Sequence, residues 1–586
     1  MCGIAGIALK PGARIDPETL AALTRALAHR GPDGSGVHVS ARAALVQTRL
    51  AIIDLATGDQ PLFGAGSALV GNGEIYNNPE LRARLGTVGF ATGSDCEPPL
   101  YLARAAADFT PDLRGMYALA IDDGQAGRVL LARDEFGIKP LYISATARGT
   151  AFASEPQALV AAGLAAPGIS TARLVELLQV QFTTGTRTVF TAIDRVAPGT
   201  TLAIAGEAVT TIAHHDPVRP GEVPRDEEAA LAALDAVLAD SVAVHQRSDV
   251  PYGMFLSGGI DSAAILALMA RLNEGKVLAM TAGFDTGTVA DERDDAAASA
   301  RAVGARHERI EIDAAMMWAH LPAIVAAMDD PVADYAIIPT WFLARHAKGS
   351  VKVILSGEGG DEMFAGYGRY RAAARPWPFA RPMRRRGAFD GLGVLRETGQ
   401  GWRAGLDEAR SGVVGGSAPG GSALERAQRE DIAGWLPNDL LLKLDRCLMA
   451  HAIEGRTPFV DREVARFAFA LADRLRARRG VGKYLLRRWL ERHLPQARPF
   501  APKQGFDVPV AAWIAARADE LAPLVARAPI IQEMTVPGRV REIFSRAADK
   551  RAGVACWRLL FLALWHHRHG LGGSGAGSVF DVLAER

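Results

Sequence analysis

The residue whose position is best suited to chemistry is Cys2, which follows the initiator Met1. Once Met1 is removed, Cys2 carries a thiol nucleophile and a free α-amine only a few bonds apart. An α-amine titrates nearer neutrality than a lysine amine, so it can take the thiol proton and later return it. A cysteine after Met is by itself usually no more than a small residue. Cys2 therefore predicts covalent attack on a carbonyl only if neighbouring groups support that reaction.

Supporting groups occur within the next hundred residues. Attack of a thiolate on a carboxamide develops an oxyanion, which needs preorganised neutral donors. The Asn72 side chain and the adjacent Gly73 N–H, directly after the apolar stretch 68–70, would supply them. A substrate with a free amino acid end also needs carboxylates for its ammonium group and an arginine for its carboxylate. Suitable groups are Glu74, Asp95 and Arg49.

A second set of functional residues begins at Ser257-Gly258-Gly259-Ile260-Asp261-Ser262, which follows one predicted strand and opens a predicted helix. Glycines let the backbone approach a pyrophosphate, and the N–H groups of the helix N-terminus bind its charge. Asp261 could reach a Mg²⁺ ion that bridges the phosphates. The run lacks the lysine of the common P-loop, so it is not that motif. A glycine-rich turn between a strand and a helix is by itself as often structural as functional.

A similar glycine-rich turn, Ser356-Gly357-Glu358-Gly359-Gly360-Asp361-Glu362, follows the predicted strand 351–355. Three carboxylates in one turn are costly unless a cationic or nucleophilic partner arrives. Positive groups for a leaving pyrophosphate occur further along, in 454–461, at Lys483 and in 502–506, which contains Lys503. The pattern indicates a site for pyrophosphate with carboxylates that await such a partner.

The elements that must position these groups change character along the chain. The first two hundred residues favour short strands with interspersed helices, and 214–224 is loop-like before a helical pattern starts near Asp226. Beyond it strands alternate with helices, which predicts a parallel sheet covered on both faces with ligands at its carboxyl ends. The predicted strands are 251–256, 277–284, 307–312 and 351–355, and the predicted helices include 261–271 and 291–303.

Two segments favour no packed structure. The stretch 381–428 is rich in Gly, Arg and Ser, which predicts a solvated, mobile insertion. The tail after Gly570 is predicted to be a loose, glycine-rich end.

Composition is that of an ordinary globular protein, with 49% apolar and 22% charged residues among 586. The net charge is +1, from 66 basic and 65 acidic residues, so no global field favours nucleic acid or membrane. We find no apolar run of the roughly 18 residues that a membrane span needs, and no secretory leader. The four cysteines are widely scattered, and a reduced cytoplasm is the expected setting.

The N-terminal groups together resemble the class II glutamine amidotransferase domain, an N-terminal nucleophile glutaminase. The resemblance covers about residues 2–195 and includes 115–118 and the long run 133–142. It implies an α+β sandwich layered α/β/β/α, in a domain placed at 2–212. By this resemblance Cys2 is the nucleophile, and Asn72 and Gly73 form the oxyanion hole. Glutamine would be held by Arg49, Leu50, Ala51, Ile52, Ile53, Asn72, Gly73, Glu74 and Asp95.

The later motifs are similar to the synthetase domain of glutamine-hydrolysing asparagine synthetases, which belongs to the ATP pyrophosphatase group. This implies a doubly wound parallel α/β sheet with a helical C-terminal part, in a domain placed at 225–570. Glu358 would be the catalytic acid, with Glu358 and Asp361 at the acceptor and Asp261 at Mg²⁺. ATP would bind at Leu256, Ser257, Gly258, Gly259, Asp261, Ser262, Ala282, Ser356, Gly357 and Lys483.

The resemblance implies a carbon–nitrogen ligase that uses glutamine as its amide donor. A substrate carboxylate would attack the α-phosphate of ATP to give an acyl-adenylate and pyrophosphate, and ammonia from glutamine would then displace AMP. Aspartate is the expected acceptor and asparagine the product. A buried passage lined largely by aliphatic residues at the domain interface would keep the ammonia neutral. The partners expected are small molecules and, from the family, a second copy in a homodimer.

Alternatives remain open at the acceptor. Tyr335 and Ile337-Ile338 stand where the family has smaller polar residues, so another carboxylate in peptide, antibiotic or polysaccharide biosynthesis is the second hypothesis. Ring closure without external ammonia is disfavoured, because the nucleophile and the groups around it are retained. A catalytically silent metabolite-binding protein is the third hypothesis, and complete motifs in both halves argue against it.

Overall fold

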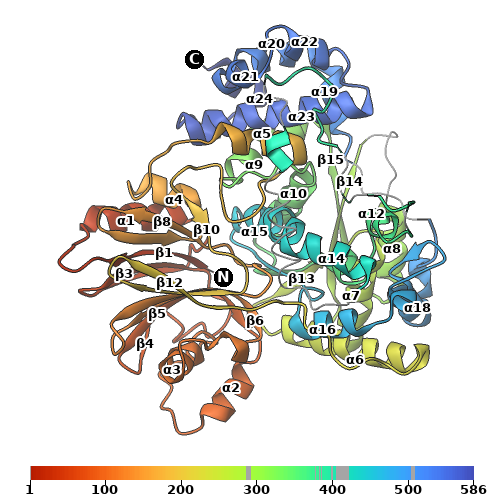
Figure 1. Ribbon diagram of the computed structural model, residues 1–586. Helices are drawn as coiled ribbons and strands as arrows, with labels where there is room; N and C mark the ends of the chain where they lie inside the picture. Colours follow the sequence, from red (N-terminus) through yellow and green to blue (C-terminus); the bar gives the residue numbers. More distant parts are fainter. Residues whose placement is uncertain are drawn as a thin grey trace.

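Three main sheets organise the chain in the computed structural model, which describes residues 2–285, 292–376, 378–381, 383, 386–396, 400–403, 421–502 and 508–585. Two six-stranded antiparallel sheets lie face to face in the N-terminal part, and a five-stranded parallel sheet forms the centre of the remainder (Figure 1). The N-terminus lies where the two parts meet (Figure 1). Cys2 is thus at the junction, next to the second part of the molecule.

Strand β1 (Cys2–Leu9) lies inside the first antiparallel sheet, and its side chains alternate between two cores. Ile4 and Ala8 pack between the sheets, whereas Ala5 and Ile7 pack against helix α1 (Pro17–Leu27). The first sheet has the order β10 (Asp194–Arg195), β8 (Tyr142–Thr146), β9 (Gly149–Ala153), β1, β3 (Ala43–Arg49) and β2 (Gly34–Val39). The second has the order β12 (Ala208–His214), β11 (Thr200–Ala205), β7 (Arg128–Arg133), β6 (Gly115–Asp123), β5 (Ser67–Ile75) and β4 (Leu62–Gly64).

Helices cover the outer face of each antiparallel sheet. Helices α1 and α4 (Pro156–Ala161) cover the first sheet, and α2 (Asn78–Leu85) and α3 (Pro98–Ala105) cover the second (Figure 1). The predicted α/β/β/α sandwich is confirmed. Helix α3 begins with Pro98 and Pro99, a position where the missing proline N–H groups cost no helix hydrogen bond.

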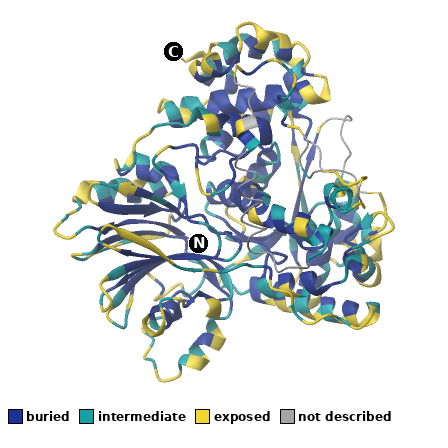
Figure 2. Ribbon diagram, in the orientation of Figure 1, coloured by how far each residue is buried: buried dark blue, intermediate teal, exposed yellow. Residues whose placement is uncertain are grey.

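The parallel sheet has the order β15 (Arg306–Ile312), β14 (Leu278–Phe284), β13 (Tyr252–Phe255), β16 (Val353–Leu355) and β17 (Glu454–Arg456). Alternate residues face opposite sides: Met254 packs with one layer of helices, and Ile354 packs with the other. One layer contains α6 (Glu227–His245), α7 (Ile260–Leu272), α8 (Arg293–Ala302), α16 (Arg462–Ala470) and α18 (Tyr484–His493). The other contains α9 (Ala314–Ala326), α10 (Ile337–Ala347) and α15 (Leu441–Met449). Both faces are buried, as Figure 2 shows, so the predicted doubly wound sheet is confirmed.

Short helices complete the second part of the chain. Helices α11 (Gly360–Met363) and α12 (Gly368–Ala373) follow β16, and α14 (Ala423–Ala433) leads through a π-helical turn (Leu436–Leu440) into α15. The C-terminal bundle contains α19 (Val510–Ala516), α20 (Ala518–Arg527), α21 (Pro529–Met534), α22 (Arg539–Phe544), α23 (Lys550–Trp565) and α24 (Val579–Ala584). The bundle packs beside α5 (Thr171–Val180) of the N-terminal part (Figure 1).

The prediction of a loose C-terminal tail is wrong. Residues after Gly570 end in helix α24, where Ser578 and Asp581 form a capping box. Val579 and Val582 of this helix are fully buried in the core that includes α9. The glycines before α24 form a connection, and the two valines anchor the tail together with Phe580 and Leu583, which pack against the same core.

The prediction of a solvated insertion at 381–428 is wrong for the parts that the structure describes. Phe389, Val394 and Leu395 are buried, and so is Trp402. Helix α14 begins within the same segment, and its Leu424 is buried too. Scattered apolar residues anchor the segment although its average composition is polar. Residues 404–420 lie outside the described ranges.

Among the described residues, none of the helices combines the length and apolarity that crossing a membrane requires.

Candidate active sites

The thiol of Cys2 lies at the first position of β1, opposite Arg49 of β3 in the antiparallel register. Gln47 on the same strand as Arg49 donates from Nε2 to Cys2 Sγ at 2.7 Å. The backbone nitrogen of Cys2 donates to Asn72 Oδ1 at 3.2 Å. This nitrogen becomes the α-amine once Met1 is removed, so the amine and thiol are both held by amide side chains.

Asn72 lies on β5 and presents an available donor beside Cys2. Its Oδ1 accepts from Cys2, whereas its Nδ2 is buried without a hydrogen-bond partner. A buried unpaired N–H group is costly, which indicates a ligand acceptor that would complete it. At the neighbouring Gly73 a Cβ atom would lie 2.1 Å from the Met116 carbonyl oxygen, so only glycine fits there. Both donors predicted for the oxyanion hole are therefore positioned by one strand.

Glu74 and Asp95 are buried carboxylates near this donor pair. Burial raises the pKa of both, the nearby Asp95 raises the pKa of Glu74 further, and Arg456 opposes that increase. Asp95 Oδ2 accepts from the Ile75 N–H at 2.7 Å. Arg49, the third predicted ligand, binds Asp59 at 2.6 Å and the Asp54 carbonyl oxygen at 2.5 Å. A ligand ammonium would oppose this rise in the two pKa values, because a nearby cation favours the ionised form of both carboxyls.

The loop that contains the predicted glutamine ligands Leu50, Ala51, Ile52 and Ile53 also contacts the parallel-sheet part. Leu50 and Ile52 pack into its core. Lys352 donates to Asp33 at 2.8 Å and to the Ala51 carbonyl oxygen at 3.5 Å. Lys352 immediately precedes β16, whose carboxyl end leads into Ser356 and Glu358. One short strand therefore separates the glutamine loop from the second site.

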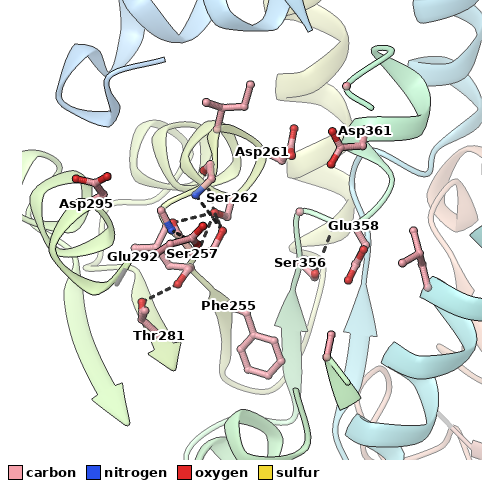
Figure 3. Close-up of a pocket in the computed structure, with 18 of the residues that line it drawn as sticks. Phe255, Ser257, Asp261, Ser262, Thr281, Glu292, Asp295, Ser356, Glu358 and Asp361 are labelled. Atoms are coloured by element: carbon pink, nitrogen blue, oxygen red, sulfur yellow. Dashed lines mark hydrogen bonds between the residues drawn. The ribbon is translucent and has the colours of Figure 1, made fainter. Parts of the chain in front are cut away.

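The second site is a cavity of about 640 Å³ at the carboxyl ends of β13, β14 and β16 (Figure 3). Every residue predicted to hold ATP or the acceptor lines it. These residues are Leu256, Ser257, Gly258, Gly259, Asp261, Ser262, Ala282, Ser356, Gly357, Glu358, Asp361 and Lys483. Segments that are far apart in the sequence meet here because the carboxyl ends of parallel strands share one edge of the sheet.

The turn after β13 is held by its own hydroxyl groups. Ser262 Oγ accepts from the Ser257 N–H at 3.1 Å and lies 3.0 Å from Ser257 Oγ (Figure 3). The Gly259 N–H donates to Ser257 Oγ at 3.1 Å, just before α7 begins at Ile260. The helix therefore starts at the cavity, where its N-terminal N–H groups favour an anion.

Lys483 links the two glycine-rich turns electrostatically. Its Nζ lies 2.5 Å from Asp261 Oδ2 and 2.7 Å from Asp361 Oδ1. Burial disfavours the charged form, but the two carboxylates outweigh burial and raise the pKa of Lys483. The residue has a left-handed φ of 54°, rare outside glycine. At Gly366 a Cβ would lie 2.2 Å from Lys483 Cε and 1.8 Å from Asp361, so this glycine makes room for the ion pair.

The chemistry of this pair fits Mg²⁺ bound together with phosphates. Mg²⁺ is usually held by one or two carboxylates plus substrate oxygens rather than by a closed protein cage. Asp261 and Asp361 both face the Lys483 ammonium, and the described residues contain no cluster of three or more His, Cys, Asp or Glu suited to a metal. Asp261 and Asp361 would hold such an ion, which would supply charge neutralisation at the phosphates.

Glu358 lies at the other side of the cavity with partners that sequence reasoning missed. Lys443 Nζ lies 3.1 Å from Asp334 Oδ2 and 3.6 Å from Glu358 Oε1. Burial raises the pKa of Glu358, Lys443 opposes this, and Asp334 and Asp361 add to it. Gln47 was missed in the same way beside Cys2. An isolated lysine on a helix and a glutamine on a strand carry no motif, so no local signal could have found them.

Two further predictions on the cavity wall have different outcomes. Tyr335 lines the cavity, as expected from the resemblance. Ile337 and Ile338 are instead fully buried in the core, because they begin α10 and face its packed side. They do not form the cavity wall. Lys503 and the run 503–506 lie outside the described residues, but Pro502 lines the cavity.

Buried charge, rather than aliphatic surface, fills the junction behind Cys2. Arg30 donates to the Cys2 carbonyl oxygen at 3.3 Å and to Glu155 and Asp445 at 2.8 Å. Lys139 lies 4.0 Å from Asp445, and burial lowers the pKa of Lys139 to about 8. Elsewhere at the junction apolar residues of the N-terminal part, such as Leu50 and Phe136, pack into the second part. The ammonia passage and its aliphatic lining stay predictions.

These features define a class: a two-part protein with a thiol site on an α/β/β/α sandwich and a nucleotide-type cavity on a parallel sheet. Residues 1–215 match the glutamine amidotransferase domain family, and residues 233–567 match the asparagine synthase family. The second match covers more than half of the chain. The chain belongs to the asparagine synthase family, as a glutamine-dependent carbon–nitrogen ligase of the asparagine synthetase type.

Individual relatives agree with this assignment. The chain is 35% identical to a glutamine-hydrolyzing asparagine synthetase homologue of Mycobacterium tuberculosis, over 97% of both chains. It is 30% identical to asparagine synthetase [glutamine-hydrolyzing] 1 of Bacillus subtilis, over 97% of this chain and 96% of that one. Asparagine synthetase B of Escherichia coli is 32% identical over 59% of this chain and 60% of its own.

Proposed function

We propose that this ligase forms asparagine from aspartate, with glutamine as the nitrogen donor and ATP as the activating substrate. The observation that carries the proposal is the single cavity that brings together the two glycine-rich turns, Glu358 and Lys483. A second, separate thiol site lies at the junction of the two parts. Two sites suit a reaction in which one releases ammonia and the other consumes it.

At the thiol site the proposed nucleophile is Cys2. The α-amine takes the thiol proton as the sulfur attacks the carboxamide carbon of glutamine. Asn72 Nδ2 and the Gly73 N–H bind the oxyanion, and the unpaired state of Nδ2 supports this role. Glu74 and Asp95 bind the ammonium of glutamine, and Arg49 binds its carboxylate. The tetrahedral intermediate then collapses, the C–N bond breaks, and ammonia leaves with the proton that the α-amine took from the thiol. Water releases glutamate from the resulting thioester.

At the cavity the proposed first step joins the acceptor to ATP. The acceptor carboxylate attacks the α-phosphate, and pyrophosphate leaves with the electron pair of the broken bond. The turn Ser257–Ser262 and the N-terminus of α7 bind the phosphate groups, and Lys483 binds the leaving pyrophosphate. Ammonia then attacks the acyl carbon, and AMP leaves. Glu358 supports this second step, and Asp361 holds the acceptor amine.

The most direct test incubates purified protein, with Met1 removed, with ATP, Mg²⁺, glutamine and aspartate. Asparagine, AMP and pyrophosphate are followed together. Equal amounts of asparagine and AMP support the proposal. Release of glutamate without asparagine or AMP rejects aspartate and directs the search to another carboxylate, the alternative that Tyr335 on the cavity wall favours.

The proposed setting is the cytoplasm, where ATP and glutamine are available and the Cys2 thiol stays reduced. All four cysteines are buried and free, which agrees with a reducing compartment. A homodimer is proposed from the family. Light scattering of the purified chain would decide the oligomeric state.

A further inference from the structure

Lys443 is the one cavity-lining cation that contacts Glu358 among the described residues. It projects from α15 and is almost fully buried, with its Nζ between Asp334 and Glu358. A lysine buried to this degree keeps its charge only if carboxylates compensate for lost hydration. Asp334, Glu358 and the nearby Asp439 do so, and they raise the pKa of Lys443 although burial opposes this. The residue is thus a fixed positive charge.

The surrounding structure holds this charge in place. Lys443 follows the π-helical turn Leu436–Leu440, a type of turn that re-aims side chains and is frequent at functional sites. Leu440 and Leu444, one helical turn apart, line the cavity together with Lys443. Asp334 is itself fixed, because its Oδ1 accepts from the Ala336 N–H at 3.0 Å.

Helix α15 is also tied to its neighbours. Cys447 Sγ donates to the Ile337 carbonyl oxygen of α10 at 3.5 Å. Gln181 of the N-terminal part donates to Asp439 Oδ2 at 2.8 Å, one turn before Lys443. These contacts leave the ammonium group little freedom to move away from Glu358.

From this geometry we propose that Lys443 is a positioning residue, which holds Glu358 as an ionised carboxylate oriented toward the acyl carbon. The proposal rests on the function proposed above. When ammonia attacks the acyl-adenylate, a C–N bond forms and the C–O bond to AMP breaks, with its electron pair leaving on AMP. The excess proton on nitrogen passes to Glu358 and then to solvent. Asp334 keeps Lys443 in place and takes no part in proton transfer.

The groups that face Glu358 decide the expected pH effect. Lys443 lies on α15, Asp334 before α10 and Asp361 on α11, and Lys443 is the only cation of the three. Without Lys443, the carboxylates of Asp334 and Asp361 and the burial of the side chain all favour the protonated form of Glu358. The acidic limb of the rate profile must then move to higher pH, because Glu358 accepts a proton only when it is ionised.

The kinetic test compares Lys443→Met and Lys443→Arg in the full chain, with Lys348→Met as a control at an exposed lysine. Ammonium replaces glutamine, so only the cavity reaction is measured. For Lys443→Met we expect kcat to fall about 100-fold and the acidic limb to rise by about one pH unit or more. Lys443→Arg should recover at least a tenth of the activity, and glutamate release from glutamine should change less than about twofold. An unmoved acidic limb in Lys443→Met would overturn the proposal.

A second measurement needs no acceptor and separates this inference from the proposed function. The Glu358 carboxyl is followed by ¹³C NMR of protein labelled at glutamate, with Glu358→Gln identifying the resonance. Lys443→Met should raise its titration midpoint, and an unchanged midpoint would overturn the inference. If wild-type protein makes no AMP with aspartate, the proposed acceptor fails, while this titration still decides the role of Lys443.

Discussion

The Arg456 guanidinium donates to Glu74 Oε2 at 3.1 Å, although the two residues are 382 positions apart in the chain. The same guanidinium binds Glu454 of β17 at 2.5 Å and the carbonyl oxygens of His245 and Arg247. All of these groups except Arg247 are buried. The carboxylate proposed to bind the ammonium of glutamine thus shares its cation with a strand of the parallel sheet, so the thiol site depends on the second part of the chain.

This relationship predicts a selective effect of Arg456→Lys. A lysine ammonium lacks the planar fork that serves two carboxylates and two carbonyls at once, so Glu74 loses its fixed position. We expect the KM for glutamine to rise about tenfold, while ammonium-dependent synthesis stays within about twofold. Arg462→Lys is the matched control, because Arg462 is a partly buried arginine that pairs with Glu135 across the same junction but does not contact Glu74. Equal loss of both activities would contradict the prediction, because it would indicate a general folding defect.

Asn72→Ala tests the unpaired donor beside Cys2. Removal of one oxyanion donor costs about 10²–10³ in kcat in comparable acyl-transfer sites. Glutamate release should fall by that factor, and ammonium-dependent synthesis should persist because the second site is separate. Asn78→Ala, which removes an amide on the nearby helix α2, should leave both rates unchanged. A variant that hydrolyses glutamine at the normal rate would exclude Asn72 from the oxyanion hole.

Lys483→Met is expected to impair the cavity reaction and to spare glutamine hydrolysis, the reverse of Asn72→Ala. The substitution keeps the length of the side chain but removes the cation between Asp261 and Asp361. Pyrophosphate release should fall at least about 100-fold, whereas glutamate release should remain. Lys276→Met, at an exposed position before β14, is the control. Pyrophosphate release at the wild-type rate would remove Lys483 from the phosphate-binding groups.

The buried carboxyl of Glu362 should make the stability of the folded protein depend on pH. Burial, with Asp361 and Asp431 adding to it, raises the pKa of this carboxyl from 4.5 to about 8. Between these two pKa values the folded state therefore holds a proton that the unfolded chain releases. The protonated carboxyl stabilises the folded state fully below pH 4.5, and this stabilisation is lost as the pH rises toward 8. Glu362→Gln, which stays neutral, should gain a few kcal/mol relative to wild type between these limits.

The measurement is the unfolding temperature of both proteins at pH 5, 7 and 8.5. We expect the difference between wild type and Glu362→Gln to grow in favour of the variant as pH rises. A constant difference would show that Glu362 is ionised in the folded protein.

Both sites show which features could be predicted from the sequence alone. The glycine-rich turns after 251–256 and 351–355 predicted a shared site, because strand–helix alternation requires a parallel sheet whose carboxyl ends share one edge. The structure places every residue of those predictions around one cavity. Likewise, the short apolar stretch 68–70 located β5, and with it the strand that presents Asn72 and Gly73. Local periodicity and local turn chemistry carry this information.

Other features were decided only by tertiary structure. Lys443 approaches Glu358, Arg456 approaches Glu74 and Lys352 approaches Asp33 across tens to hundreds of residues, with no pattern in the sequence around them. The anchored insertion and helix α24 depend on a few apolar side chains whose partners lie elsewhere in the chain. The sequence by itself determined the elements and the reactive motifs, since these depend on neighbouring residues. Long-range packing decided which charges meet, because burial and pairing exist only in the folded chain.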